Sequence, residues 1–313
     1  MNKKVIYIVD NIDYIRSTPY QNQLFISLQK ICELKIVDLN FMKRAKSVKN
    51  LGSYDEILVC LKLRTIKRNI SLISSFLEGE PFRVYEQDPW ENYMDNGDWK
   101  GTYQLLMNNS NVLFFANTSK TWADFGLEKG IPTKFVRMGI IPEFCNNDFN
   151  INEKQYDIGF IGRAHPYRKS MIDYINLNTK YNFYYPLKER PFSHSGFLKE
   201  INKIKIYCHN ESLEVLCDNK KMNLADGMWV KNIEAMAAGC FSLRNYSKDL
   251  HSYIDDSFQT FFTFNNFEEI EEIVDKILSI NKKDSEKMIK ETIENIIKKD
   301  YWKETAQILI GER

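Results

Sequence analysis

Residues 157–169 read DIGFIGRAHPYRK. A short apolar run ends at Gly162 and is followed at once by Arg163, while Arg168 and Lys169 open the next helical pattern. Glycine lets backbone approach a ligand closely, and a helix N-terminus offers free N–H groups with partial positive charge. Together with the cations, this arrangement suits a diphosphate. The competing interpretation is a solvated basic surface, but the position directly after a buried strand favours a binding site.

Two kinds of segment alternate on both sides of this stretch. Short β-branched and aromatic runs are typical of strands, and the amphipathic runs between them are typical of helices. The expected strands are Val5–Val9, Leu34–Leu39, Glu56–Leu63, Phe82–Glu86, Val112–Ala116, Lys134–Met138, Tyr156–Gly162, Asn182–Tyr185, Ile204–His209, Cys240–Arg244 and Gln259–Phe264. The expected helices are 18–31, 71–78, 118–129, 168–176, 196–201, 228–238 and 267–280. This order predicts βαβ units around parallel sheets.

A polar, asparagine-rich stretch at residues 139–156 divides the alternating pattern into two series and is typical of a linker. We therefore expect an α/β protein with two doubly wound, Rossmann-like domains at residues 1–150 and 151–295. Residues 283–310 repeat isoleucine at helical spacing and predict further helix. Because ligands of such folds bind at the carboxyl ends of the strands, we expect the site in a cleft between the domains.

The overall composition excludes several classes of protein. The 313 residues include 43 Lys and Arg against 42 Asp and Glu, so there is no net field to hold nucleic acid. The 6 cysteines occur singly, which argues against a disulfide framework or a structural zinc site. No window resembles a signal peptide or a membrane span. We expect a cytoplasmic protein with no metal and no cofactor.

A second informative stretch, residues 227–244, reads GMWVKNIEAMAAGCFSLR. Lys231 and Glu234 lie three residues apart on one helix face, and Gly239 predicts the end of the helix before a strand. Glu234 lies among apolar residues, where an unpaired carboxylate would be costly to bury. Its partner can be a ribose diol, with two hydroxyl donors for two acceptor oxygens, or the ammonium group of Lys231.

Together the two stretches resemble a family. Gly162-Arg163 followed by Lys169, and Lys-x-x-Glu-Ala-Met-Ala-x-Gly about 65 residues later, look like the nucleotide-sugar-binding domain of GT-B glycosyltransferases. The likeness is to the large retaining family of mannosyl- and glucosyltransferases and to spore-maturation-protein-like relatives. Residues 135–144 also resemble the interdomain passage of that family.

The resemblance implies roles for particular residues. Arg163 and Lys169 would hold the donor diphosphate and stabilise its charge during the reaction, and Glu234 would bind the nucleotide ribose. Gly162 and Lys231 belong to the same two motifs, and Arg168 is a further phosphate candidate by adjacency. The resemblance also implies that a C-terminal helix, residues 296–313, crosses back onto the first domain.

Two departures from the family pattern bear on the reaction. The family usually has a second glutamate, which serves the sugar, seven residues before the position of Glu234, where this chain has Gly227 with Asp226 beside it. Either Asp226 substitutes for that glutamate or the donor sugar is recognised differently. Many members also have a histidine in the first domain, whereas all 4 histidines here lie in the second half. The corresponding strand end instead carries Asp88 and Glu91. Either could face the cleft as a base, or both could be solvated loop acids.

The resulting expectation is a metal-independent glycosyltransferase that moves a sugar from a nucleotide-diphosphate donor to a glycan, lipid-linked or protein acceptor. The family likeness implies retention of the anomeric configuration, whereas a base at Asp88 would favour inversion. A nucleotide-sugar epimerase and a non-catalytic partner subunit of the same fold are the alternatives. The basic stretches 43–49 and 62–68 are solvated faces or, alternatively, contact an anionic surface such as the inner membrane face.

Overall fold

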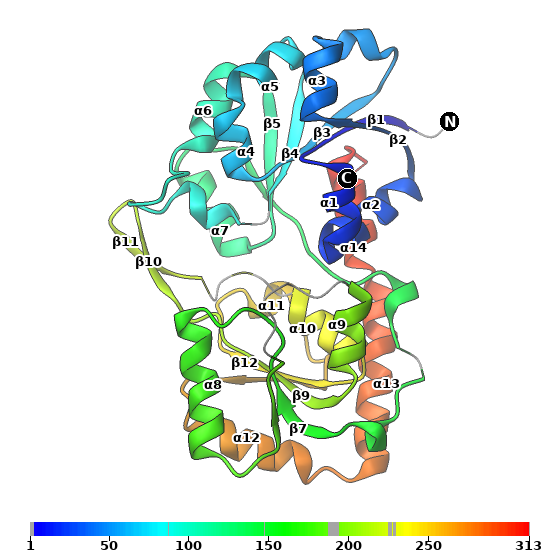
Figure 1. Ribbon diagram of the computed structural model, residues 1–313, viewed down its shortest axis with the longest axis vertical. Coiled ribbons are helices and arrows are strands. Elements are labelled where there is room, and N and C mark those ends of the chain that lie inside the picture. The colour runs from blue at the N-terminus through cyan, green and yellow to red at the C-terminus, as the bar shows by residue number, and fades with distance from the viewer. Residues whose placement is uncertain are drawn as a thin grey trace.

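The computed structural model describes residues 3–86, 88–146, 148–186, 194–224, 227 and 230–312 of the chain. Two α/β domains stand one above the other, each with a parallel sheet flanked by helices (Figure 1). The expected fold class, α/β with two doubly wound domains, is confirmed.

Six parallel strands form the first sheet, in the order β2-β1-β3-β4-β5-β6. They are β1 (Lys3–Val9), β2 (Cys32–Asp38), β3 (Glu56–Cys60), β4 (Phe82–Glu86), β5 (Val112–Asn117) and β6 (Thr133–Phe135). Helices cover both faces, and the apolar run from Val5 to Val9 in β1 is accordingly buried at every position. Because β1 lies between β2 and β3, the strand order reverses at the carboxyl ends of β1 and β3.

The helices of the first domain are α1 (Ile12–Ser17), α2 (Pro19–Gln29), α3 (Leu39–Ala45), α4 (Leu63–Arg68), α5 (Ile70–Leu77), α6 (Thr102–Asn109) and α7 (Lys120–Glu128). Of these, α2, α5 and α7 are expected from the sequence. The other four have six to eight residues, too few for a clear helical period. Ser119 caps α7 by accepting a hydrogen bond from the Trp122 amide.

Five parallel strands form the second sheet, in the order β13-β12-β9-β7-β8. They are β7 (Tyr156–Gly159), β8 (Phe183–Tyr184), β9 (Ile204–His209), β12 (Phe241–Asn245) and β13 (Phe261–Phe264). The helices around this sheet are α8 (Pro166–Asn178), α9 (His194–Ile201), α10 (Val230–Ala237), α11 (Leu250–Tyr253), α12 (Glu269–Leu278) and α13 (Lys282–Lys299). Here the strand order reverses between β7 and β9, so their carboxyl ends border the second switch point.

A β-hairpin extends from the second domain onto the first. It consists of β10 (Glu214–Cys217) and β11 (Lys220–Asn223), joined by a turn at Asp218 and Asn219. Val215 and Cys217 belong to the hydrophobic core beneath the first sheet, and Figure 1 shows the hairpin at the side of both domains. The carboxylate of Asp95 accepts hydrogen bonds from the amides of Asp218 and Asn219, at 2.9 and 3.0 Å. No strand is expected here from the sequence.

The helical tail expected at residues 283–310 consists of two helices. Helix α13 ends where Asp300 takes a left-handed conformation, with φ of 35°, and the Asp300 side chain caps α14 (Tyr301–Leu309). Helix α14 packs against α2, and the buried ring of Trp302 meets Tyr85 edge to face at 6.5 Å between centroids. Residues from the last helix therefore complete the core of the first domain (Figure 1).

A carboxylate of the second domain caps a helix of the first. Asp249, just before α11, is buried and accepts hydrogen bonds from Ser119 Oγ at 2.6 Å and from Thr121 N and Oγ1 at 2.9 and 2.6 Å. These groups lie at the N-terminus of α7, where free amides and the helix dipole favour a negative charge. Within the described ranges, none of the helices is long and apolar enough to cross a membrane.

Candidate active site

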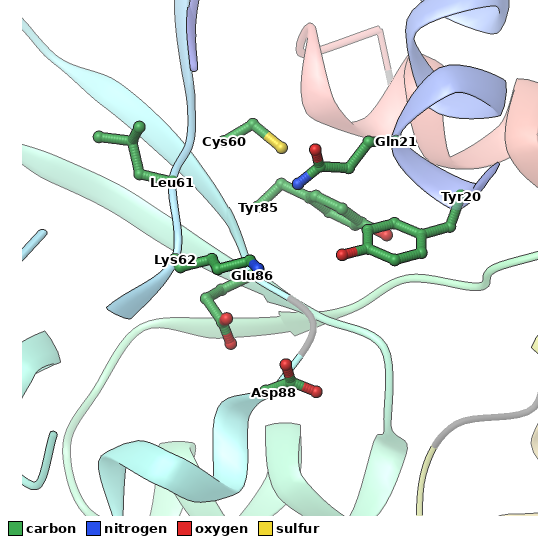
Figure 2. Close-up of a pocket in the computed structure, with 8 residues that line it drawn as sticks. All are labelled: Tyr20, Gln21, Cys60, Leu61, Lys62, Tyr85, Glu86 and Asp88. Carbon is green, nitrogen blue, oxygen red and sulfur yellow. The ribbon is translucent and has the colours of Figure 1, made fainter. Parts of the chain in front are cut away.

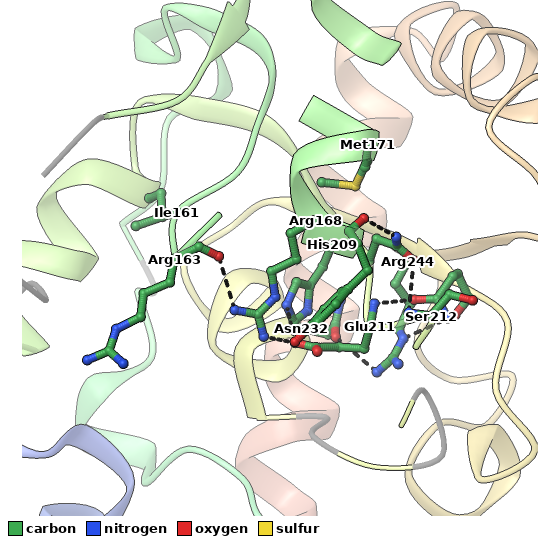
Figure 3. Close-up of polar contacts among 12 residues, drawn as sticks. Ile161, Arg163, Arg168, Met171, His209, Glu211, Ser212, Asn232 and Arg244 are labelled. Carbon is green, nitrogen blue, oxygen red and sulfur yellow. Dashed lines mark hydrogen bonds and ion pairs between the residues drawn. The ribbon is translucent and has the colours of Figure 1, made fainter. Parts of the chain in front are cut away.

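Residues 157–169, for which the sequence predicts a diphosphate site, lie at the switch point of the second sheet. Strand β7 ends at Gly159 and continues through Phe160 and Ile161 into the turn at Gly162 and Arg163, before α8 begins at Pro166. A Cβ added at Gly162 would lie 2.8 Å from Phe160 Cζ, so a larger residue would displace that ring. The Arg163 side chain is exposed, and Figure 3 shows it pointing away from the buried groups beside it.

Arg168, in contrast, is buried and already paired. Its Nη2 forms an ion pair with Glu211, which follows the end of β9, and its Nη1 donates a hydrogen bond to the carbonyl of Arg163 at 3.3 Å (Figure 3). The guanidinium also lies 5.3 Å from the ring centre of Tyr167 and 5.9 Å from that of Phe160. In this state the charge of Arg168 is neutralised from within the domain.

Glu211 is the centre of this buried cluster. It accepts a hydrogen bond from His209 Nε2 at 2.8 Å, and its amide donates to Asn245 Oδ1 at 2.8 Å. Burial disfavours the ionised carboxylate, but His209 and Arg168 outweigh it and lower the pKa of Glu211 to about 2. Burial lowers the pKa of His209, which favours the neutral imidazole. Glu211 is therefore ionised at neutral pH and held from several sides.

Lys169 lies on the exposed face of α8. Its Nζ is 2.5 Å from Asp173 Oδ2, one helical turn further on, and 62% of its side chain is exposed. The structure thus places the three cations of the stretch in different surroundings: Arg163 is exposed at the turn, Arg168 is buried and Lys169 is paired on the outer surface.

The second stretch forms α10, which ends at Gly239 with φ of 76° as expected for a helix terminus. Glu234 is fully buried and lies 2.7 Å from Lys231 Nζ, measured from Oε2. Its Oε1 is 3.4 Å from Nε2 of Gln23, which comes from α2 of the first domain. Gln23 also accepts a hydrogen bond from the amide of Ile141 at 2.8 Å. Glu234 therefore lies where the two domains meet.

Gly227 stands where the family that the sequence resembles has its second glutamate. Gly227 is buried, and a Cβ there would lie 3.5 Å from Ser119 Cβ and 3.9 Å from Trp90 Cζ3, both in the first domain. Asp226, the alternative sugar ligand, lies outside the described residues.

The facing edge of the first domain carries a small polar pocket. Lys62 and Asp88 each follow the end of a strand by two residues, after β3 and β4 respectively. Figure 2 shows the side chains gathered around the pocket: Tyr20, Gln21, Cys60, Leu61, Lys62, Tyr85, Glu86 and Asp88. Carboxylates, an ammonium group, an amide and phenols thus meet at the carboxyl edge of the sheet.

The acids of this edge have raised pKa values. Burial, and after it the charge of Glu91, raise the pKa of Asp88 to about 7 against the opposing effect of Lys62. The negative charge of Glu211, on the other domain, contributes to the same increase. Burial raises the pKa of Glu91 as well, while Arg64 and Lys62 lower it. A group with a pKa near 7 can accept or donate a proton at physiological pH.

Sequence reasoning missed Glu211 and Gln23 as parts of this region. Glu211 could have been found, because it follows the end of β9 just as Arg163 follows β7, and adjacent parallel strands bring their carboxyl ends together. Gln23 gives no such signal, since its contact with Glu234 spans 211 positions and depends on how the domains meet.

Comparisons with known proteins identify the fold. No family model and no curated protein matches the chain. Anabaena HepE in complex with UDP and glucose is similar over 99% of both chains, with a TM-score of 0.60 and 9% sequence identity. The E. coli trehalose-6-phosphate protein bound with UDP-2-fluoro glucose covers 99% of this chain and 98% of its own, with a TM-score of 0.61 and 8% identity.

Sucrose-phosphate synthase from Thermosynechococcus elongatus also matches, over 99% of this chain and 98% of its own, with a TM-score of 0.58 and 10% identity. These neighbours are GT-B glycosyltransferases, and at such low identity the likeness establishes architecture alone. The resemblance inferred from the two sequence motifs is thus confirmed at the level of the fold, and the chain has the GT-B fold.

Proposed function

We propose that this protein is a glycosyltransferase that moves a sugar from a nucleotide-diphosphate sugar to a glycan, lipid-linked or protein acceptor. The observation that carries the proposal is the exposed Arg163 at the switch point of the second sheet. It is supported by the GT-B neighbours that were solved with UDP or a UDP-sugar. For this reason we place UDP first among the nucleotides.

The proposed mechanism depends on charge at the leaving group. As the bond between sugar and phosphate breaks, positive charge develops on the sugar and negative charge on the departing diphosphate. Arg163 and the N-terminus of α8 stabilise that negative charge. Preorganised hydrogen-bond donors of this kind usually make the largest contribution to transition-state stabilisation. In this proposal no metal is required. Lys169 joins them by leaving Asp173, an exchange that costs little because surface ion pairs are weak.

The nucleotide would lie against α10. We propose that its ribose hydroxyls bind Glu234 and take the position of the long Gln23 contact, while Lys231 stays beside the carboxylate. On the first domain, Asp88 would accept the proton of the acceptor hydroxyl. That role favours inversion of the anomeric centre, whereas the family resemblance favours retention. Proton NMR of the fresh product distinguishes the two outcomes, and a screen for slow donor hydrolysis identifies the sugar.

Titration calorimetry with UDP and GDP tests the phosphate site. We expect Arg163→Ala to bind UDP at least tenfold more weakly than the wild type, a loss of about 1.4 kcal/mol. Arg44→Ala is the matched control, because Arg44 is an exposed arginine on α3 of the first domain. Equal UDP affinity in the wild type and Arg163→Ala would remove the site from this turn.

A further inference from the structure

We propose that Glu211, through Arg168, is a positioning residue that holds the turn after β7 so that Arg163 presents its charge to the donor diphosphate. This inference rests on the proposed function. It assigns Arg168 a different task from direct phosphate binding, and it gives Glu211 a task that the sequence motifs do not suggest.

The turn has little support of its own. Gly162, Arg163, Ala164 and His165 are all exposed. Within the turn, the carbonyl of Arg163 accepts a hydrogen bond from the amide of His165 at 3.0 Å. An exposed four-residue segment with one internal bond can adopt many conformations, and fixing each residue costs about 1–2 kcal/mol in entropy. Contacts from elsewhere in the domain must therefore fix where Arg163 points.

Arg168 supplies one such contact. Its Nη1 donates to the same carbonyl of Arg163, and its Nη2 pairs with Glu211, so one planar group connects the turn with the end of β9. The donors of a guanidinium stand in a fixed fork, and fixing one side therefore orients the other. Its Nε has no hydrogen-bond partner among the residues that the structure describes, so these two polar contacts, with the neighbouring rings of Tyr167 and Phe160, orient the guanidinium.

The neighbouring residue Asn210 supplies a second contact. Its Nδ2 donates to the carbonyl of Tyr167 at 2.7 Å, in the first turn of α8. The side chain of Glu211 is 2% exposed, and the residue is held by His209 Nε2 and by Asn245 Oδ1. Two successive residues that follow β9 thus hold the turn, through Arg168, and the first turn of α8 directly after it. Asn210 and Glu211 are both buried. Arg163, in contrast, lies on the exposed surface of the turn and points away from the buried cluster (Figure 3).

The charge arrangement agrees with a positioning role. A buried ion pair adds little to stability compared with well-packed apolar residues, because two charges must leave water. Its value lies in geometry. Glu211 neutralises Arg168 inside the domain, whereas Arg163 is exposed at the turn, where a ligand can reach it. Removal of the Glu211 charge would leave Arg168 without its counter-ion and free to turn away from the Arg163 carbonyl.

A double-mutant cycle tests this coupling. UDP affinity is measured by calorimetry for the wild type, Glu211→Gln, Arg163→Ala and the double variant. We expect Glu211→Gln to weaken UDP binding about tenfold. In the Arg163→Ala background, the same change should have no further effect, because Glu211 acts through Arg163. Asp157→Asn is the matched control, since it breaks the Lys205 ion pair at the opposite end of the same sheet.

Folding is followed by circular dichroism and thermal melting for every variant. Asn210→Ala is a second test, because removing this neutral side chain does not leave a buried charge without its counter-ion. It should weaken UDP binding in the wild-type background but not in the Arg163→Ala background. Arg168→Lys keeps the charge but loses the fork, so it should behave like Glu211→Gln. These results separate positioning from a general loss of structure, which would lower affinity in both backgrounds.

The outcomes distinguish the inference from the proposed function. If Arg163→Ala binds UDP as the wild type does, the phosphate site itself is wrong, and this inference falls with it. If Arg163→Ala weakens binding while Glu211→Gln has no effect, or an equal effect in both backgrounds, the phosphate site stands and the positioning role is overturned.

Discussion

Asp88 is the residue whose titration bears most directly on the proposed reaction. With its pKa raised to about 7 by burial, it is partly protonated at neutral pH. As a base it must be ionised to accept the proton of the acceptor hydroxyl. We therefore expect kcat/KM to rise with pH and to level off above about pH 7. Asp88→Asn should lose activity and this rising limb together. A profile that keeps the same limb in Asp88→Asn would assign it to another group.

The same shift has a consequence for stability. The folded protein binds the Asp88 proton more tightly than the unfolded chain, whose carboxyl has the ordinary pKa of 3.8. Stability from this residue is therefore present at low pH and is lost as the pH rises from about 4 to about 7. Consequently, the melting temperature of Asp88→Asn should fall less between about pH 5 and pH 8 than the melting temperature of the wild type. This measurement needs no substrate.

At the residue scale, the sequence predicted local arrangements, such as Lys231 and Glu234 on one helix face, and missed pairs between residues far apart in the chain. Arg163 follows an apolar strand and a glycine, so its position just after the strand end could be predicted from the sequence. Arg168 was a phosphate candidate only because it stands beside Lys169. Its partner Glu211 is 43 positions away, and no local pattern connects them. Which cation is neutralised within the domain is decided by packing between β7 and β9.

At the element scale, the hairpin β10–β11 could not be predicted from the sequence. Each of its strands has only four residues, and the second reads Lys-Lys-Met-Asn, without an apolar alternation. Its turn residues Asp218 and Asn219 have positive φ values of 48° and 63°, as two-residue hairpin turns require. The strands form because Val215 and Cys217 are buried in another domain, and a local sequence window cannot show that burial.

The contacts of the hairpin turn with Asp95 can be tested. Asp95→Ala removes the acceptor for the amides of Asp218 and Asn219 and one of the two carboxylates paired with Lys100. We expect the hairpin to open more often, so that limited proteolysis cuts it faster than in the wild type. Glu214→Ala is the control, because it breaks only the exposed ion pair with Lys221 within the hairpin. Equal cleavage rates in the wild type and Asp95→Ala would mean that the Asp95 side chain does not hold the hairpin in place.

At the scale of the whole molecule, the fold class was predictable because it follows from the alternation of strands and helices along the chain. The contacts between the domains were not. The Asp249 cap of α7, the Gln23 contact with Glu234 and the docking of the hairpin each join residues more than 100 positions apart. Such contacts depend on complementary surfaces, which a single sequence does not reveal.

Asp249 offers the prediction at this scale. Asp249→Ala removes three hydrogen bonds at the N-terminus of α7, one of them from the buried hydroxyl of Ser119. We expect the free energy of unfolding to fall by about 2 kcal/mol. Denaturation with urea measures this loss. Asp255→Ala, which breaks an exposed ion pair with Lys299, should change stability far less. Should both variants unfold at the same urea concentration, the interdomain cap would contribute nothing.

The packing of α14 against α2 has a consequence for how the protein is made. Trp302, Ala306, Leu309 and Ile310 fill the core of the first domain, although they are translated long after its strands. Val215 and Cys217 are likewise late additions to the same domain. While the chain is still on the ribosome, the amino-terminal half therefore exposes apolar surface that its own residues cannot cover. Its final collapse must wait for the second half, which reverses the usual order in which domains mature during synthesis.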